Sequence, residues 1–470
     1  MSRRAPATRG RRAPATRGGR PPATRGARRP AATASVVAAH RVVLDNGLAV
    51  IVRPNPATVS VAIHLALPAG AAYDPPGQSG TASLAARLLD RGAGGLEAGR
   101  IALDFESLGI AFVARARLDS LDATARLLAR DLPFVLERLR VIVTEPAFPE
   151  DEVAAERARV LTEIAERDQD TAAQADDRLA AALFPEGHPY HSPAAGTRAG
   201  VERIGRADLV RFHAARVRPI GAVLCIAGGV DEKAAFHLAQ RTFGGWRPEG
   251  RLDGRPSPGV HANVIPDPPA PGGFRVIVHP IAGKSQADIA LGFVPGVRRR
   301  GDDLQAALVM SSILGEFGMG GRLGLTVREN AGLAYYAHSY VWAGLGAGPV
   351  VVRAGVAPAN VVRAAALIRK VVAEFLRRGP RPAELADSRQ ALTAALPRRF
   401  ETNPLSAAIL ADCEYQGLGY DFPDRVPERL AAVDRAAVMA AAQRYLTPTQ
   451  AVLVVTGPDI PPRRLGRPPG

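Results

Sequence analysis

The side chains that most often bind metal ions are scarce in this sequence of 470 residues. Of its nine histidines only His188 and His191 stand close together, and the prolines of the surrounding GHPYHSP predict a turn, not a helix presenting both rings on one face. The two cysteines, Cys225 and Cys413, cannot build a disulfide framework, and the apolar run AVLCIAGG predicts a buried strand thiol at Cys225. These residues predict no metal site in the chain.

Carboxylates and glycines provide two further groups with potential chemistry. Glu156 and Glu163 are seven residues apart in a predicted helix, so both project from one face, although they could equally be ordinary solvated charges. The segment LGEFGMGGRL is rich in glycines that let the backbone approach a ligand or adopt positive φ. A flexible turn at a helix end would need the same residues. These glycines are Gly315, Gly318, Gly320 and Gly321.

The composition is that of a soluble globular protein, with 47% hydrophobic and 22% charged residues. The formal net charge of +15 is unevenly spread, because residues 1–39 hold ten arginines and no acid, which leaves about +5 for the rest. With only 5% aromatic residues, a nucleic-acid interface is not expected. No run approaches the roughly 18 apolar residues of a membrane span. Since the N-terminus lacks the apolar core of a signal peptide, we expect a cytoplasmic location, or a periplasmic one if the start codon is misassigned.

Regular structure is predicted to begin near His40, after an Arg/Pro/Ala repeat that cannot bury a core. Alternating apolar residues around Asp45-Asn46-Gly47 predict a hairpin in HRVVLDNGLAVIVRP, and TVSVAIHLALPAG predicts a third strand. GTASLAARLLDRG, residues 80–92, is a short helix with an apolar stripe. Longer helices are predicted over Ala123–Ile142, Glu150–Leu183 and Arg206–Arg216, and AVLCIAGGV closes this half as a strand.

A similar order of elements recurs after a proline-rich stretch. FRVIVHP, ADIALGFVPG, VVVRAGV and AVLVVTG predict strands, and helices are predicted over Asp302–Leu314, Pro358–Arg377 and Pro382–Leu396. PEDEVAAERARVLTEI aligns with RPAELADSRQALTAAL, and GAVLCIAGGVD with QAVLVVTGPD, in each case about 230 residues apart. This pattern indicates an internal duplication.

We therefore expect an α+β fold of two homologous domains, each a mixed, mostly antiparallel sheet with helices packed on one face. The expected domains are residues 40–247 and 273–460, joined by a linker at 248–272 and flanked by tails at 1–39 and 461–470.

Three segments resemble the insulinase/pitrilysin family of metallopeptidases, which includes the mitochondrial processing peptidases. They are LDNGLAVIVRPNP, FPEGHPYHSPAAGTRAGVERIGRADLVRFHAARVRP and GGRLGLTVRENAGLAYYAHS. The resemblance extends from about His40 to Pro458, nearly the whole chain after the first tail. It implies a peptidase fold built for a zinc site with the motif HxxEH.

This resemblance places the zinc motif on the helix at residues 80–92, where the motif side chains are missing. Ser83 and Arg87 stand at the two histidine positions, and Ala86 stands at the glutamate position between them. Glu163 stands where the family has its third ligand, and Glu156 matches a second family acid. Because catalytic zinc requires three protein ligands, we expect no zinc in this chain, and we predict that Arg87 pairs with Glu163 in place of the ion.

In the second half, Arg328 and Tyr335 match an arginine and a tyrosine that the family directs toward substrate. Arginine offers a fixed fork of donors, and a tyrosine hydroxyl can donate to a carbonyl oxygen as negative charge develops on it. Alternatively, Arg328 pairs with Glu329 or another acid and Tyr335 fills the core. The glycine-rich segment resembles the substrate-handling loop of the non-catalytic subunit of processing peptidases.

The resemblance implies a zinc-less subunit of a heterodimeric peptidase that is inactive alone. A homologous partner would carry HxxEH and zinc, and this chain would contribute peptide binding and transition-state stabilisation. The alternative is a non-catalytic homodimer with a structural or peptide-binding role.

Overall fold

The first sheet starts with the predicted hairpin of β1 (His40–Val43) and β2 (Ala49–Pro54). Gly47 in its turn adopts a φ of +89°, which a side chain would disfavour. Four further strands complete the sheet in the order β1-β2-β8-β3-β7-β6, and only β2 and β8 run parallel. These strands are β3 (Ser60–Leu67), β6 (Ala111–Ala116), β7 (Leu121–Leu128) and β8 (Val223–Gly228). Cys225 is fully buried in β8, as predicted.

This computed structural model describes residues 35–247, 265–316 and 321–466. The expected tail at 1–39 and linker at 248–272 thus lie largely outside the described residues. In the described part of the chain, no helix combines the length and the apolar character needed to cross a bilayer.

The second sheet repeats the order of five strands of the first, read from β6 to β2. Its order is β11-β12-β10-β13-β9, and only β13 and β9 run parallel. The strands are β9 (Arg275–Pro280), β10 (Ala287–Gly292), β11 (Ala334–Val341), β12 (Val350–Val356) and β13 (Val452–Gly457). In both sheets the last strand of the half, β8 or β13, lies beside the first long strand of that half. The α+β fold and the mostly antiparallel sheets are therefore confirmed.

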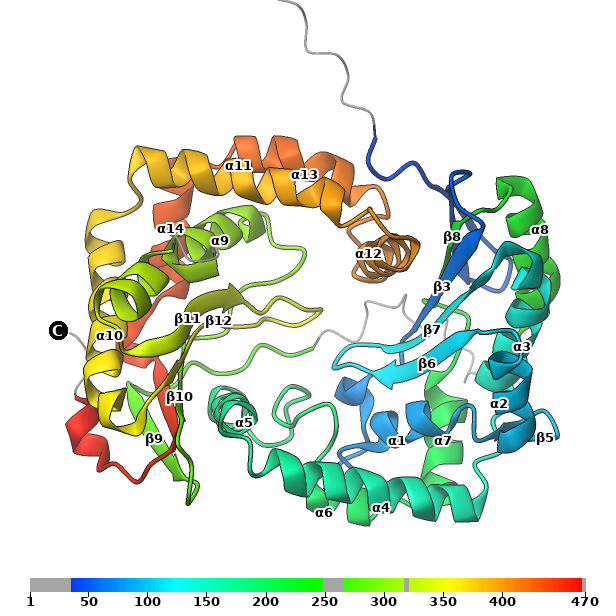
Figure 1. Ribbon diagram of the computed structural model, residues 1–470, viewed down its shortest axis with the longest axis horizontal. Helices are drawn as coiled ribbons and strands as arrows, with labels where there is room; N and C mark the ends of the chain where they lie inside the picture. The colour runs from blue at the N-terminus through cyan, green and yellow to red at the C-terminus, as the bar shows by residue number, and fades with distance from the viewer. Residues whose placement is uncertain (1–34, 248–264, 317–320, 467–470) are drawn as a thin grey trace, which may run out of the picture. The chain divides into compact units, whose positions relative to one another are not determined.

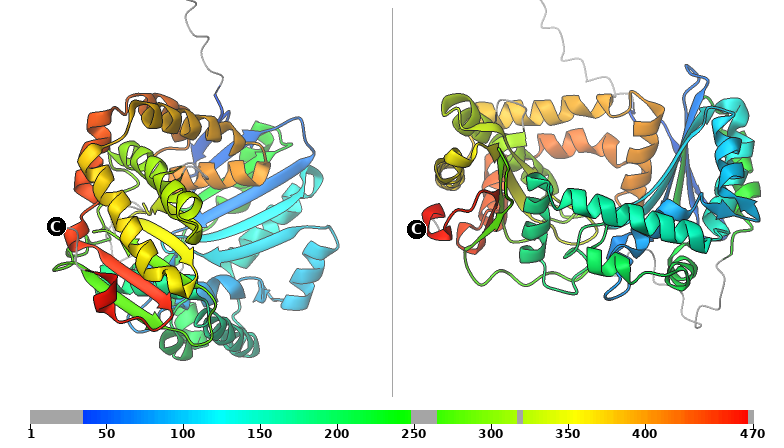
Figure 2. Two further views of the ribbon diagram at one scale, coloured as in Figure 1. Left: turned by 60° about the vertical axis from the view of Figure 1, so that its left-hand side comes forward. Right: turned by 60° about the horizontal axis from the view of Figure 1, so that its bottom comes forward.

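Each sheet carries its own helices on one face (Figure 2). Apolar side chains of these helices and of the sheet form one core cluster in each half. The first group is α1 (Thr81–Leu88), α2 (Ala98–Glu106), α3 (Leu132–Thr144), α7 (Arg206–Arg216) and α8 (Glu232–Phe243). The second includes α9 (Leu304–Ser311), α10 (Val361–Arg378) and α14 (Arg435–Tyr445).

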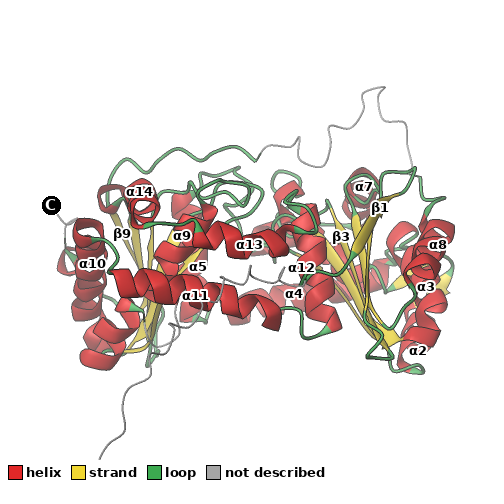
Figure 3. Cartoon of the chain, turned by 90° about the horizontal axis from the view of Figure 1, so that it is seen from above, coloured by secondary structure: helices red, strands yellow, loops and turns green. Residues whose placement is uncertain are grey.

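The opposite face of each sheet is covered by a helix from the other half of the chain. Helix α5 (Thr171–Leu183) packs on β10 and β13, and α12 (Asn403–Tyr415) packs on β3 and β8 (Figures 1 and 3). These helices follow α4 (Glu150–Arg167) and α11 (Pro382–Arg398), the two helices that the duplicated sequence pattern aligned. This exchange of helices was not foreseen from the sequence.

Two predicted helices were wrong at their boundaries. Residues 123–128 belong to strand β7, because pairing with both β3 and β6 overrides the helix propensity of an Ala/Leu/Arg-rich segment. The predicted helix Glu150–Leu183 is divided into α4 and α5. Asp170 is the N-cap of α5, because its side chain accepts a hydrogen bond from the backbone amide of Ala173 at 2.9 Å. The break lets the chain turn from the first half onto the second sheet.

Candidate functional site

Helix α1 is the element on which the family resemblance places chemistry, and it is deeply buried. It starts after Gly80, whose φ is +108°. Asp74 accepts hydrogen bonds from the amides of Gly80 at 2.7 Å and Ala82 at 2.8 Å, which anchors the first turn. Burial raises the pKa of Asp74 to about 7, although these amide hydrogen bonds oppose the shift. The helix packs against α4, which brings Arg87 of its last turn to the acids of α4.

Arg87 forms an ion cluster with the two acids of α4. Its Nη1 donates to Oε1 of Glu156 and to Oε1 of Glu163, both at 3.0 Å, and its Nη2 donates to Oε2 of Glu163 at 2.5 Å. The predicted pair of Arg87 and Glu163 is therefore confirmed, with Glu156 as an additional partner. The hydrogen bonds that Arg87 donates to Glu163 are the largest cause of its raised pKa, so its positive charge is permanent.

The residues around this cluster do not fit a catalytic metal ion. Ser83 and Ala86 are buried and supply no ligand that zinc commonly takes. A fixed guanidinium lies between the two carboxylates that remain. Glu156 is further neutralised by Arg159, whose Nη1 donates to it at 2.6 Å. Across the described residues, no group of three or more His, Cys, Asp or Glu side chains could hold a metal ion.

Tyr335 does not fill the core, since it is 83% exposed. It is the extra residue of a β-bulge, because Ala334 pairs with Val356 while Tyr336 pairs with the adjacent Gly355. A bulge of this kind redirects a side chain away from its regular position on the sheet. No pattern in the sequence indicated this bulge.

Arg328 lies shortly before β11, in the wide π-helical turn Gly324–Asn330. Its Nε is 3.5 Å from Oε1 of Glu329, so the neighbouring acid considered in the sequence analysis is its partner. Both side chains are more than 40% exposed. Such an ion pair contributes little to stability and can exchange for another anion.

The glycine-rich segment is described only in part, since Gly318 and Gly320 lie outside the described residues. Gly315 and Gly321 have packing reasons to lack a side chain. A Cβ at Gly315 would lie 2.8 Å from the backbone nitrogen of Ser339, and one at Gly321 would lie 2.6 Å from Cα of Gly315. A role of this segment in substrate handling stays a prediction.

The histidines of GHPYHSP have structural partners. Nε2 of His188 lies 2.9 Å from the carbonyl oxygen of Pro266, and Nδ1 of His191 lies 2.9 Å from that of Phe184. Between them Tyr190 donates its hydroxyl to Oδ1 of Asp119 at 2.7 Å and accepts from the amide of Gly346 at 2.9 Å. This segment therefore ties the first half of the chain to the second.

Comparison with known families matches both halves of the chain. Residues 49–198 match the model of the insulinase family (peptidase family M16), and residues 203–392 match the model described as the peptidase M16 inactive domain. The chain belongs to the insulinase family. In this insulinase-family chain, the match to the inactive-domain model includes the whole segment that carries Arg328 and Tyr335.

Several relatives of this insulinase-family chain are described as zinc proteases. An uncharacterized zinc protease of Mycobacterium tuberculosis is 28% identical over 433 residues, covering 90% of this chain and 94% of the relative. One of Bacillus subtilis is 22% identical over 362 residues, covering 77% and 84% of the two chains. Subunit 1 of the mouse mitochondrial cytochrome b-c1 complex is 29% identical over 211 residues, covering 45% and 43%.

Solved structures share the fold of this insulinase-family chain. A structure described as a peptidase M16 inactive domain from Pseudomonas fluorescens superposes with a TM-score of 0.80 at 24% identity, covering 90% of this chain and 98% of its own. A protease from Helicobacter pylori also gives a TM-score of 0.80, at 21% identity, covering 89% and 99%. Two domains of this family fold are thus present.

Proposed function

We propose that this chain is the zinc-less subunit of a heterodimeric peptidase whose homologous partner carries the HxxEH motif and the zinc ion. The observation that carries the proposal is the ion cluster on α1 and α4. Arg87 binds Glu156 and Glu163, so these acids are already neutralised by a cation of the chain itself. Hydrolysis by this chain alone is therefore not expected, and zinc would be supplied by the partner.

In this proposal, Arg328 and Tyr335 act on a peptide held between the two subunits. The exposed hydroxyl of Tyr335 can donate to the carbonyl oxygen of a scissile bond as negative charge develops there. Arg328 can exchange Glu329 for a substrate carboxylate or carbonyl group, because its present ion pair is exposed and long. Gly315, Gly318, Gly320 and Gly321 are proposed to line the path of the peptide.

The test is purification of the untagged chain from its native cell under mild conditions. We expect a homologous chain with HxxEH to co-purify in equal amount, and we expect zinc and peptidase activity only in fractions that contain both. Identification uses mass spectrometry, metal analysis and a fluorogenic peptide library. Chelator-sensitive peptidase activity of this chain in the absence of the partner would overturn the proposal.

The assigned residues are tested in the reconstituted heterodimer. Tyr335→Phe and Arg328→Gln should each lower kcat/KM by about tenfold to a thousandfold, because each removes a donor to a developing charge. Arg377→Gln, an exposed arginine at the end of α10, is the matched control and should leave kcat/KM unchanged. Equal effects of all three variants would refute the assignment.

The second candidate is a non-catalytic homodimer with a structural or peptide-binding role. The similarity to a subunit of the cytochrome b-c1 complex favours it, because that relative is named as part of a larger assembly. Native mass spectrometry of the complex purified from the cell distinguishes the candidates. A homodimer without an HxxEH chain would support this second role.

A further inference from the structure

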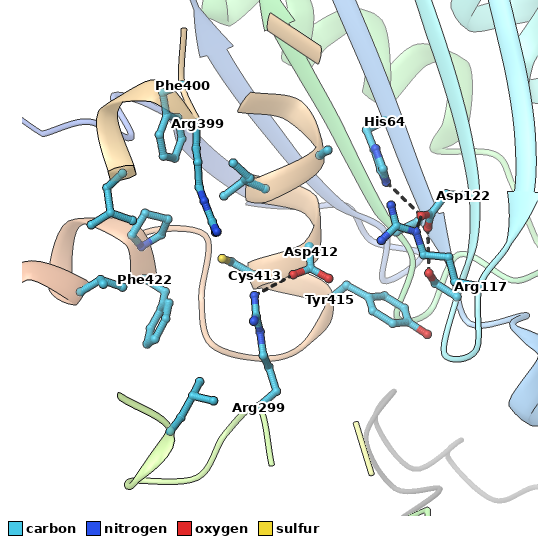
Figure 4. A pocket seen from close by; sticks show the side chains of 18 of the residues that line it. His64, Arg117, Asp122, Arg299, Arg399, Phe400, Asp412, Cys413, Tyr415 and Phe422 are labelled. Atoms are coloured by element: carbon cyan, nitrogen blue, oxygen red, sulfur yellow. Dashed lines mark hydrogen bonds and ion pairs between the residues drawn. The ribbon is translucent and has the colours of Figure 1, made fainter. Parts of the chain in front are cut away.

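A cavity of about 280 Å³ lies between the first sheet, the end of α11, and the helices α12 and α13 (Phe422–Ala431) (Figure 4). It shares no lining residue with the Arg87 cluster or with Arg328 and Tyr335. Its lining combines an apolar wall with several charged side chains. The apolar wall contains Leu304, Leu308, Phe400, Ile409, Phe422 and Val426.

Both acids of the cavity already have cationic partners. Buried Asp122 accepts from Nε of Arg117 at 2.6 Å and from Oγ of Ser120 at 2.8 Å, and Nε2 of His64 is 3.7 Å from it. Asp412 accepts from Nη2 of Arg299 at 3.1 Å. Each carboxylate is therefore neutralised within the cavity.

One arginine remains in excess. Arg399, which directly follows α11, is partly open to solvent and extends along the cavity in Figure 4. Within the described residues, no acid lies within ion-pair distance of its guanidinium. In addition, Nε of Arg299 is buried and has no hydrogen-bond partner among these residues. The cavity thus has one uncompensated positive charge and one unused buried donor, beside an apolar wall.

We infer that this cavity binds a monocarboxylate with an apolar group next to the carboxylate, held by Arg399 and Arg299. A guanidinium offers paired donors that match the two oxygens of a carboxylate. The single excess charge favours a monoanion over a phosphate or a dicarboxylate. The volume is near the lower limit of ligand pockets, which suits one amino-acid residue with its terminal carboxylate. Such a ligand is either the C-terminal residue of a peptide or a free organic acid.

The test is a titration of the purified full chain, monitored by ligand-observed NMR. The two probes are N-acetyl-leucine and the tripeptide Ala-Ala-Leu, each compared with its C-terminal amide. We expect the acids to bind and the amides to bind at least tenfold more weakly. Binding of both acids identifies a site for small acids, whereas binding of the tripeptide alone identifies a site for peptide C-termini. Equal binding of acids and amides, or no binding of either acid, would overturn the inference.

Variants then assign the site. Arg399→Gln should weaken binding of the acid by about tenfold to a hundredfold, and Arg399→Lys should recover part of that loss. Arg398→Gln is the matched control, since Arg398 directly precedes Arg399, is likewise exposed and does not line the cavity. Ala408→Phe should reduce binding by filling the cavity, and melting temperatures confirm folding of each variant. Unchanged affinity in both Arg399→Gln and Ala408→Phe would contradict the assignment. These measurements use the chain alone, so their outcome is independent of any peptidase partner.

Discussion

At the scale of single residues, the side chain at position 87 decides how the acids of α4 are compensated. A neutral residue there would leave two carboxylates of α4 facing α1, whereas Arg87 binds both. The buried member, Glu156, is 4% exposed and needs a counter-charge, because an unpaired buried carboxylate is costly. We interpret Arg87 as a structural replacement for a metal ion.

Arg87→Ala should lower the free energy of unfolding by about 2 kcal/mol, because Glu156 loses one of its two cationic partners inside the protein. Urea unfolding measures the change. Arg198→Ala is the control: its pair with Glu202 is exposed, with 3.9 Å between the charged atoms, and its loss should cost less than about 0.5 kcal/mol. Similar effects of the two substitutions would show that the Arg87 cluster is not structurally important.

The double substitution Ser83→His with Arg87→His should create zinc affinity, because it places two imidazoles one helical turn apart, facing Glu163. We expect about one zinc ion per chain after dialysis, measured by elemental analysis. Arg87→His alone supplies too few ligands and should retain far less zinc. Equal zinc contents in the two proteins would refute the assignment of α1 as a former zinc helix.

At the scale of elements, the start of α11 is held by Glu384. Burial alone would raise its pKa, but hydrogen bonds from Arg322 and Arg381 outweigh burial and lower the pKa to about 2. The folded-state pKa lies below the ordinary value of 4.5. The stabilisation of the folded state by these ion pairs is therefore complete above pH 4.5 and is lost as the pH falls toward 2.

Comparison of Glu384→Gln with the unchanged chain tests this pH dependence. The variant should be less stable by a constant amount above about pH 5, and the difference should shrink below that pH as Glu384 becomes protonated in the unfolded state. Thermal melting between pH 3 and pH 7 measures the difference. A difference that stays constant down to pH 3 would contradict the assigned ion pairs.

Helix α5 is attached to the second sheet through buried polar groups. Arg353 on β12 is 6% exposed; it donates to the carboxylate of Asp176 and to the carbonyl oxygen of Ala172 at 3.0 Å. Thr171 donates to Oδ2 of fully buried Asp288 at 2.6 Å. These contacts specify where α5 lies, because each leaves an unsatisfied buried group if the helix moves.

Asp176→Ala should cost about 3 kcal/mol, since it leaves the buried guanidinium of Arg353 without its counter-ion. The control is Asp177→Ala, at the adjacent residue of the same helix. Asp177 pairs with Arg167, which is partly exposed and belongs to the first half, so its loss should cost about 1 kcal/mol. Chemical denaturation compares the two. A larger cost for Asp177→Ala would show that the contact with Arg353 does not hold α5 in place.

At the scale of the whole molecule, the exchange of α5 and α12 makes each half incomplete alone. Without α12, the first sheet would expose Ala49, Ile51 and Ala62, which pack against Leu410 and its neighbours. Residues 36–470 form one compact unit, although the sequence contains two homologous halves.

Calorimetry of the full chain should therefore give a single unfolding transition, because loss of either half uncovers a face of the other. The variant Asp176→Ala should move the whole transition to lower temperature. Residues 36–247 expressed alone should bind a hydrophobic dye, since the face that α12 covers would be exposed. Two separate transitions, of which only one responds to Asp176→Ala, would contradict this coupling.

The duplication, the α+β class, the helix at Arg206–Arg216 and the pairing of Arg87 with Glu163 were determined by the sequence. Local periodicity decides the helix and the class, the repeated order of elements shows the duplication, and the pairing was predicted because the family resemblance places Arg87 and Glu163 at one site. The strand at residues 123–128, the break between α4 and α5, and the β-bulge at Tyr335 were decided by tertiary structure. Each depends on contacts with segments far away in sequence, as do the helix exchange and the cavity beside Arg399. Local preferences carry no information about such contacts, because burial and pairing arise only when the two halves pack together.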